Sequence, residues 1–314
     1  MPNLPIVAVV GATASGKSDL ALDLAEQLGG EVVNTDAMQV YRGMDIGTAK
    51  LAVTERRGIP HHLLDRQEVT EPASVAQFQQ WARAVVADCR SREVVPVLVG
   101  GSALYTRAIL DVFDFPGTDA QVRARYEARL ASEGAGALHA ELAARAPEVA
   151  KDILPSNGRR IVRALEVVEL TGDFTPTLPE ATYVDPDTIQ IGVDIDRPTL
   201  DERIAVRVEA MFAAGFVEEV RRLDAAGLRE GLTASRAIGY RQVLAHLDGE
   251  ITEAQAREQT ITGTRRFARR QDSWFRKDAR VAWVGYDDPA RVQAATALVE
   301  AVATGELRRP RPTA

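Results

Sequence analysis

The sequence lacks a set of cysteines, any long apolar run and an overall excess of positive charge. Cys89 is the single cysteine, which excludes an intramolecular disulfide framework and a thiolate-rich zinc site. No apolar run approaches the roughly 18 residues that a membrane helix needs, and runs such as 6–10 and 94–99 have the length of buried strands. The first residues carry no basic segment typical of a secretory signal, so we expect a cytoplasmic protein without membrane contact.

Acidic residues outnumber basic ones overall, but positive charge is concentrated in one stretch. The formal net charge of −7 argues against nonspecific binding to nucleic acid. Residues 264–280, however, hold seven arginines and lysines against two aspartates, with Phe267, Trp274 and Phe275 interleaved. This mixture favours a surface that contacts RNA phosphates and stacks on bases over a solvated, salt-bridged helix face. Trp274 taken alone is equally typical of an aromatic side chain that anchors a helix.

Short apolar runs alternate with helical patterns in the first hundred residues. Leu20, Leu24 and Leu28 recur four apart, which is helical spacing, and the β-branched run 6–10 directly before them is typical of a buried parallel strand. The elements expected in this part are strand, helix, strand, helix and strand over 6–10, 17–28, 31–34, 78–89 and 94–99. Such an alternation predicts a parallel sheet with helices on both faces.

The pattern changes near residue 117, because only helical segments follow up to about residue 172. Alternating apolar residues over 189–195 then indicate a strand, the chain after Pro198 is helical almost to residue 279, and 281–284 predicts a last strand. The predicted fold is therefore an α/β, P-loop NTPase-like parallel sheet flanked by helices, with a mostly helical insertion domain. The expected parts are the first part of the core, the insertion, and the core completion with C-terminal helices, over 1–117, 118–187 and 188–314.

A phosphate-binding pattern, G-x-x-x-x-G-K-[ST], occupies residues 11–18 between an expected strand and an expected helix. Its glycines let backbone N–H groups point at a phosphate, and the start of the helix adds a partial positive charge. Lys17 supplies a full charge, and the Ser18 hydroxyl is placed to ligate Mg²⁺. ATP-binding proteins share the pattern, so it does not identify the reaction. The candidate phosphate-binding residues are Gly11, Ala12, Thr13, Ala14, Ser15, Gly16, Lys17 and Ser18.

The acidic residue that a P-loop ATPase places after a hydrophobic strand is missing from the strand over 94–99, which is followed by Gly100, Gly101 and Ser102. An acid follows the second strand instead, as Asp36. A carboxylate facing the phosphate loop can ligate a metal through water or act as a general base. An aspartate that satisfies its own turn backbone is the alternative.

Several further segments resemble the tRNA dimethylallyltransferase family, whose members are also called tRNA isopentenyltransferases. These segments lie over 36–50, 60–65, 99–105, 163–167, 215–220, 238–242 and 264–276. The family transfers a dimethylallyl group from dimethylallyl diphosphate to N6 of the adenosine just 3′ of the tRNA anticodon, releasing diphosphate. The chain departs from the family pattern at Ala12, where many members have proline, and at Ser102, where threonine is common.

The resemblance implies roles for individual residues. Thr13, Ser15, Gly16, Lys17 and Ser18 would bind the diphosphate, with Mg²⁺ on Ser18. Asp36 would be the base for the adenine amine, and Met38 and Gln39 would line the pocket of the extruded base. The catalytic set is then Asp36, Lys17 and Ser102. Including the basic stretch, the expected tRNA contacts are Asp36, Ala37, Met38, Gln39, Ser102, Arg123, Arg159, Arg160, Arg163, Arg241, Arg265, Arg266, Arg269, Arg270 and Trp274.

The expected partners are a tRNA anticodon stem-loop and dimethylallyl diphosphate, with Mg²⁺ as cofactor and a monomeric protein. Two enzyme alternatives remain open at this point: an isopentenyltransferase acting on free adenine nucleotides, and a P-loop small-molecule kinase. Neither calls for the basic stretch over 264–280. His61 and His62 are expected to be structural, because adjacent histidines in an extended segment point in opposite directions.

Overall fold

The computed structural model describes residues 4–112, 115–172, 174 and 179–306, and in this part of the chain six parallel strands form one sheet. Their order across the sheet is β3-β2-β4-β1-β5-β6. The strand bounds are β1 Ile6–Val10, β2 Glu31–Asn34, β3 His61–His62, β4 Pro96–Gly100, β5 Thr188–Asp194 and β6 Val281–Gly285. Every neighbouring pair is parallel, which confirms the predicted sheet.

Helices connect the strands, and a further helix follows the last strand. The α-helices are α1 Lys17–Leu28, α2 Val75–Ser91, α3 Ala103–Leu110, α4 Ala120–Arg145, α5 Pro147–Lys151, α6 Gly158–Thr171, α7 Arg197–Ala213, α8 Phe216–Ala225, α9 Tyr240–Leu247, α10 Glu253–Phe275 and α11 Arg291–Ala303. Short 3-10 turns lie at η1 Val53–Glu55, η2 Leu228–Glu230 and η3 Ala234–Arg236. Among the described residues, no helix is long and apolar enough to cross a membrane.

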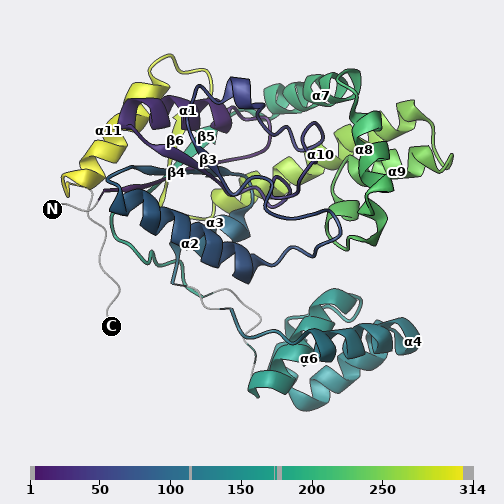
Figure 1. Ribbon diagram of the computed structural model, residues 1–314. Helices are drawn as coiled ribbons and strands as arrows, with labels where there is room; N and C mark the ends of the chain where they lie inside the picture. Colours follow the sequence, from purple (N-terminus) through teal and green to yellow (C-terminus); the bar gives the residue numbers. More distant parts are fainter. Residues whose placement is uncertain (1–3, 113–114, 173, 175–178, 307–314) are drawn as a thin grey trace. The chain divides into compact units, whose positions relative to one another are not determined.

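Strand periodicity divides the core of the sheet into two layers. Val7 and Val9 pack with residues of α1 and α11, whereas Ala8 and Val10 pack with residues of α2 and α3. These two pairs of helices cover opposite faces of the sheet (Figure 1). Alternation of side chains along a strand produces this division. Because both faces are covered, β1 is apolar throughout and fully buried.

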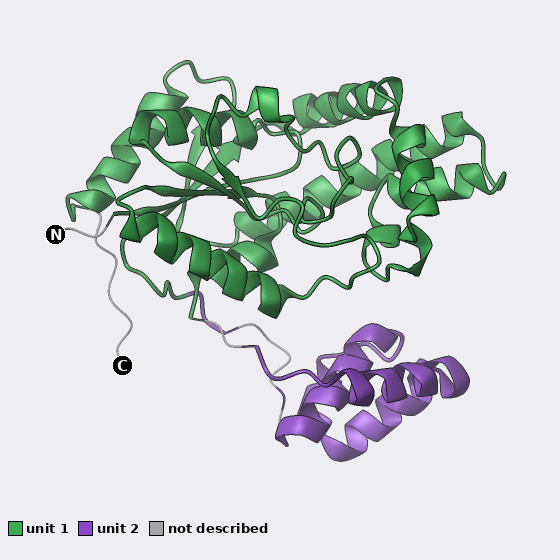
Figure 2. Ribbon diagram, in the orientation of Figure 1, with its two compact units in different colours: residues 1–112, 182–314 green, residues 113–181 purple. Residues whose placement is uncertain are grey.

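The chain forms two compact units, which Figure 2 distinguishes: residues 1–112 with 182–314, and residues 113–181. The second unit corresponds to the helical insertion, which we expected over 118–187. The first unit is closed near residue 112 by two backbone hydrogen bonds of 2.8 Å, from Val112 N–H to the Thr182 carbonyl and from Val184 N–H to the Leu110 carbonyl. This pairing keeps residues 182–187 with the core. Residues 1–3, 113–114, 173, 175–178 and 307–314 lie outside the description.

Within residues 113–181, α4 and α6 pack around a small core that includes Tyr126, Leu138 and Ile161. Gly134 interrupts α4 with a φ of 83° and a ψ of 163°. The buried Glu166 carboxylate accepts hydrogen bonds from the Thr118 hydroxyl (2.7 Å) and the Asp119 N–H (3.0 Å). These bonds attach the segment before α4 to α6.

Candidate active site

The phosphate loop joins the carboxyl end of β1 to α1 and has the backbone of an anion site. Gly16 lies in the left-handed region with a φ of 95°, and Ala14 has a φ of 64°. The Ser15 hydroxyl is buried and has no hydrogen-bond partner among the described residues. Because a buried hydroxyl without a partner is costly, it indicates a place for an external acceptor such as a phosphate oxygen.

Lys17 begins α1, and its Nζ donates to the Ala12 carbonyl at 3.2 Å. Burial and, to a smaller extent, the nearby Arg207 guanidinium lower the pKa of Lys17 to about 8, against the opposing effect of the Asp36 carboxylate. The sequence analysis missed Arg207 and Arg203, which come from α7. Arg203 donates through Nε to the Ala14 carbonyl at 2.9 Å, so α7 brings two cations to the phosphate loop.

Asp36 follows β2, and one of its oxygens is used locally. Its Oδ1 accepts the Met38 N–H at 2.9 Å, and Asn34 Oδ1 accepts the Asp36 N–H at 2.8 Å. Oδ1 therefore satisfies the backbone of its own turn, as in the alternative interpretation of Asp36. The other oxygen, Oδ2, forms no hydrogen bond with the described residues. The Ser102 Oγ accepts the Ala37 N–H at 3.4 Å, which places Ser102 beside Asp36.

Two glycines at the end of β4 allow the surrounding segments to converge. A Cβ on Gly100 would lie 2.2 Å from the Thr35 Oγ1, and a Cβ on Gly101 would lie 2.2 Å from the Gln271 Nε2. Real atoms do not approach so closely, so a side chain at Gly100 would push the backbone after β2 away, and one at Gly101 would displace the Gln271 amide. The carboxyl ends of β1, β2 and β4 thus meet at one point, which is where α/β sheets bind ligands.

A cavity of about 420 Å³ opens at this point. Thr13, Ala14, Asp36, Ser102 and Arg207 contribute to its polar side. The apolar residues that line it include Ile204, Val208, Met211, Phe216, Ile238 and Phe267. Of the other expected site residues, Ala37, Met38 and Arg270 also line the cavity. The Gln39 amide donates to the Thr48 carbonyl at 3.1 Å and is not among the lining residues, so its expected contact with adenine stays a prediction.

The basic stretch proves to be divided between internal and exposed arginines. Arg265 donates to the Asp201 carbonyl at 3.0 Å through Nη2, and the downstream Arg280 pairs with the buried Asp111 at 2.6 Å. In the described part of the chain, three arginines of α10 form no hydrogen bond or ion pair and are exposed: Arg266, Arg269 and Arg270. Trp274 is 37% exposed and lies with its ring 5.9 Å from the Arg107 guanidinium.

The expected arginines of the insertion are placed differently from one another. Arg123 and Arg163 form ion pairs with the buried Glu166 at 2.8 and 3.0 Å, so each has a structural role in this unit. Arg159 and Arg160 are exposed near the start of α6. In the other unit, Arg241 is exposed on α9. The tRNA contacts expected of these arginines stay predictions.

Glu219 holds the loop that follows Asp36, and the sequence analysis gave no sign of this role. Its buried carboxylate accepts the backbone N–H groups of residues 45, 46 and 47 at 3.1, 2.7 and 3.1 Å. Burial raises the pKa of Tyr240, whose protonated hydroxyl donates to Glu219 Oε1 at 2.6 Å. Because Gly47 and Tyr240 line the cavity, Glu219 fixes part of its wall.

Replacing Glu219 with alanine is expected to lower the free energy of unfolding by about 3 kcal/mol or more. Each buried donor left without an acceptor costs about 1–3 kcal/mol, and several lose their acceptor here. Urea unfolding followed by circular dichroism measures the change. Glu218→Ala is the matched control, since Glu218 is exposed and pairs only with Arg221 in the described chain. Equal stabilities of the two variants would contradict the role of Glu219.

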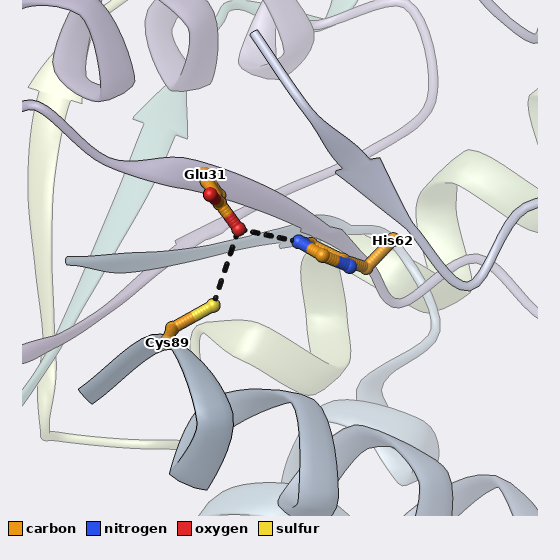
Figure 3. A group of neighbouring side chains, drawn as sticks. All are labelled: Glu31, His62 and Cys89. Carbon is orange, nitrogen blue, oxygen red and sulfur yellow. Dashed lines mark hydrogen bonds and ion pairs between the residues drawn. The ribbon is translucent and has the colours of Figure 1, made fainter. Parts of the chain in front are cut away.

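Glu31, His62 and Cys89 form a cluster whose potential ligand atoms lie within 4.8 Å of one another (Figure 3). Arg92 already holds Glu31 with two hydrogen bonds of 2.8 and 2.7 Å, and His62 Nε2 lies 2.7 Å from Glu31 Oε2. Burial raises the pKa of the Cys89 thiol to about 11, so the side chain is a neutral thiol in this network. We interpret the cluster as a structural hydrogen-bond network, in agreement with the expectation for His62.

Comparisons with known proteins identify the family of the chain. The profile of the IPP transferase family matches residues 39–278. A protein of Nocardioides sp. strain JS614 named tRNA dimethylallyltransferase is 68% identical over 302 residues, covering 96% of this chain and 97% of its own length. A tRNA dimethylallyltransferase of Streptomyces griseus is 61% identical over 283 residues, covering 89% and 90%. The chain therefore belongs to the IPP transferase family.

A solved structure supports the same assignment. The full-length tRNA isopentenylpyrophosphate transferase of Bacillus halodurans superposes with a TM-score of 0.72 at 36% identity, covering 96% of this chain and 98% of its own. The likeness therefore extends over both units of the chain.

Proposed function

We propose that this protein is a tRNA dimethylallyltransferase, which transfers a dimethylallyl group from dimethylallyl diphosphate to N6 of the adenosine 3′ of the anticodon. The observation that carries the proposal is the cavity itself. A phosphate loop with a buried unpartnered hydroxyl borders it at Thr13 and Ala14, an apolar wall faces the loop, and Asp36 lies beside both. A diphosphate, a short hydrocarbon chain and an amine fit these three kinds of surface.

The proposed reaction is a displacement at the allylic carbon. The bond between this carbon and the diphosphate oxygen breaks, and the diphosphate leaves with the electron pair. A new bond forms between the same carbon and the adenine N6, whose proton passes to the free Oδ2 of Asp36. Lys17, Arg207 and the loop amides stabilise the charge that builds on the diphosphate, because they are held in place before the reaction. The side chains of Val208, Met211 and Phe216 shield the reacting carbon from water.

The residues present fit a bound Mg²⁺. Ser18 is exposed at the start of α1, and among the described residues its hydroxyl forms no hydrogen bond. A serine hydroxyl together with diphosphate oxygens is the hard oxygen donor set that Mg²⁺ prefers. When bound, the ion would neutralise charge on the departing diphosphate. Ser18 would hold it.

The position of α10 favours a polymeric acceptor over a small molecule. This helix lines the cavity through Phe267 and Arg270 and carries Arg266 and Arg269 on its exposed surface. A free adenine nucleotide would leave these arginines without a function, and a small-molecule kinase would have no need of them. We therefore favour tRNA as the acceptor. We further propose that the enzyme is monomeric and cytoplasmic.

The proposal is tested by incubating the protein with labelled dimethylallyl diphosphate, Mg²⁺ and unmodified tRNA, without ATP, and with AMP as a parallel acceptor. Label in the tRNA alone is the expected result. Label only in AMP would replace the polymer with a free nucleotide as the acceptor. ATP turnover on a small acceptor, with no prenyl transfer to either substrate, would favour a kinase.

Replacing both Arg266 and Arg269 with alanine is expected to weaken tRNA binding and to lower its dependence on salt. Each arginine that neutralises a phosphate contributes about one unit to the slope of log affinity against log salt concentration. Filter binding at several salt concentrations gives this slope. Arg222→Ala removes an exposed arginine of α8 and serves as the control. If the slope of the double variant equals that of the wild type, the α10 surface does not contact tRNA.

A further inference from the structure

Gln271 connects α10 to both loops of the candidate active site. Its side chain is buried, with only 5% of its surface exposed. Oε1 accepts the Thr13 N–H of the phosphate loop at 2.9 Å, and Nε2 donates to the Gly101 carbonyl at 2.9 Å. One amide therefore holds the loop after β1 and the turn after β4, which precedes Ser102.

The backbone of Gly101 packs closely against the Gln271 amide and the phosphate loop. A Cβ on Gly101 would lie 2.2 Å from the Gln271 Nε2 and 3.1 Å from the Gly11 carbonyl. The three segments thus touch directly, without space for a side chain between them. Since an amide side chain both donates and accepts, glutamine satisfies the two backbone groups at once, whereas a carboxylate or a hydrocarbon of the same length does not.

We propose that Gln271 is a positioning residue that orients the phosphate loop for diphosphate and sets the distance between this loop and α10. The inference rests on the proposed function and extends it. The Thr13 N–H is directed to Gln271 and the Ser15 N–H to the Ala12 carbonyl at 3.3 Å, so the Ser15 hydroxyl is left for the ligand. Arg269 and Arg270 lie directly before Gln271 on the same helix. The segment that meets the acceptor and the loop that meets the donor are therefore held by one rigid element.

The test compares Gln271→Met with the wild type for binding of inorganic diphosphate in the presence of Mg²⁺, measured by isothermal titration calorimetry. Methionine keeps most of the volume but loses both hydrogen bonds. We expect the dissociation constant for diphosphate to rise about tenfold or more, because Thr13 N–H and Gly101 C=O lose their buried partner. The tRNA dissociation constant is expected to stay within about twofold, which a general loss of structure would not permit. Gln259→Ala, an exposed glutamine on the same helix, is the control.

A second variant keeps the inference testable if the methionine protein is unstable. Gln271→Glu retains an acceptor for the Thr13 N–H but cannot donate to Gly101, and it adds a negative charge beside the loop. It is expected to bind diphosphate more weakly than Gln271→Met, with tRNA binding unchanged. Diphosphate binding at the wild-type level in either variant would overturn the inference. A wild-type protein that binds no diphosphate at all would instead refute the proposed function.

Discussion

Replacing Asp36 with asparagine is expected to lower the rate constant of prenyl transfer by about 10²–10⁴-fold, the usual contribution of a general base. Asparagine keeps the carbonyl oxygen that accepts the Met38 N–H, so the turn after β2 is preserved. It cannot accept the proton that N6 releases. The expected loss therefore concerns the chemical step and leaves the substrates bound.

Single-turnover measurements with saturating tRNA and dimethylallyl diphosphate isolate this step, and filter binding gives the tRNA affinity separately. Asp45→Asn is a matched control, because Asp45 lies in the same loop, is exposed and pairs with Lys50. It should retain most of the rate. If Asp36→Asn loses tRNA affinity and rate by the same factor, Asp36 is a binding residue and the base must be sought elsewhere.

Replacing Lys17 with methionine should lower kcat/KM for dimethylallyl diphosphate by about 10²–10³-fold, comparable to the loss of one preorganised donor to a developing oxyanion. The lysine faces the Asp36 carboxylate and the Arg207 guanidinium. Removing its charge leaves the departing diphosphate without the cation at the loop. Steady-state kinetics at fixed, saturating tRNA measures the change.

The same lysine predicts a pH dependence. Its pKa of about 8 means that the cation is present below pH 8 and is lost as the pH rises above this value. The cation is the form that binds diphosphate, so kcat/KM should fall up to tenfold per pH unit above pH 8. Lys17→Arg keeps its charge throughout this range, and its smaller activity should show no such fall. A wild-type profile that stays flat up to pH 9.5 would contradict the role of the Lys17 charge.

The parts of the fold that the sequence predicts are those with a strong local pattern. Residues 6–10 and 17–28 form β1 and α1 with the expected bounds, because the apolar run and the leucine spacing are set by neighbouring residues. The two-residue strand β3 is too short for any pattern. The alanine-rich α11 has few polar residues to mark an exposed face, and both elements were missed.

The candidate site was predictable where a motif carries the residue, and not where a distant contact does. Lys17 and Asp36 lie in recognisable segments directly after strands. Gln271 meets the phosphate loop across 258 positions of sequence, and Arg203 meets it across 189. Such pairs depend on how α7 and α10 pack against the sheet, which single-sequence periodicity does not describe.

We propose that this protein prenylates one particular atom of a tRNA, N6 of the adenosine 3′ of the anticodon. The most direct measurement is nuclease digestion and mass spectrometry of tRNA after reaction with the wild-type protein, with the Asp36→Asn protein as the blank. We predict a mass increase of one dimethylallyl group on a single fragment, located at N6 of the adenosine 3′ of the anticodon. Modification spread over many adenosines, or equal modification by the Asp36→Asn protein, would contradict it.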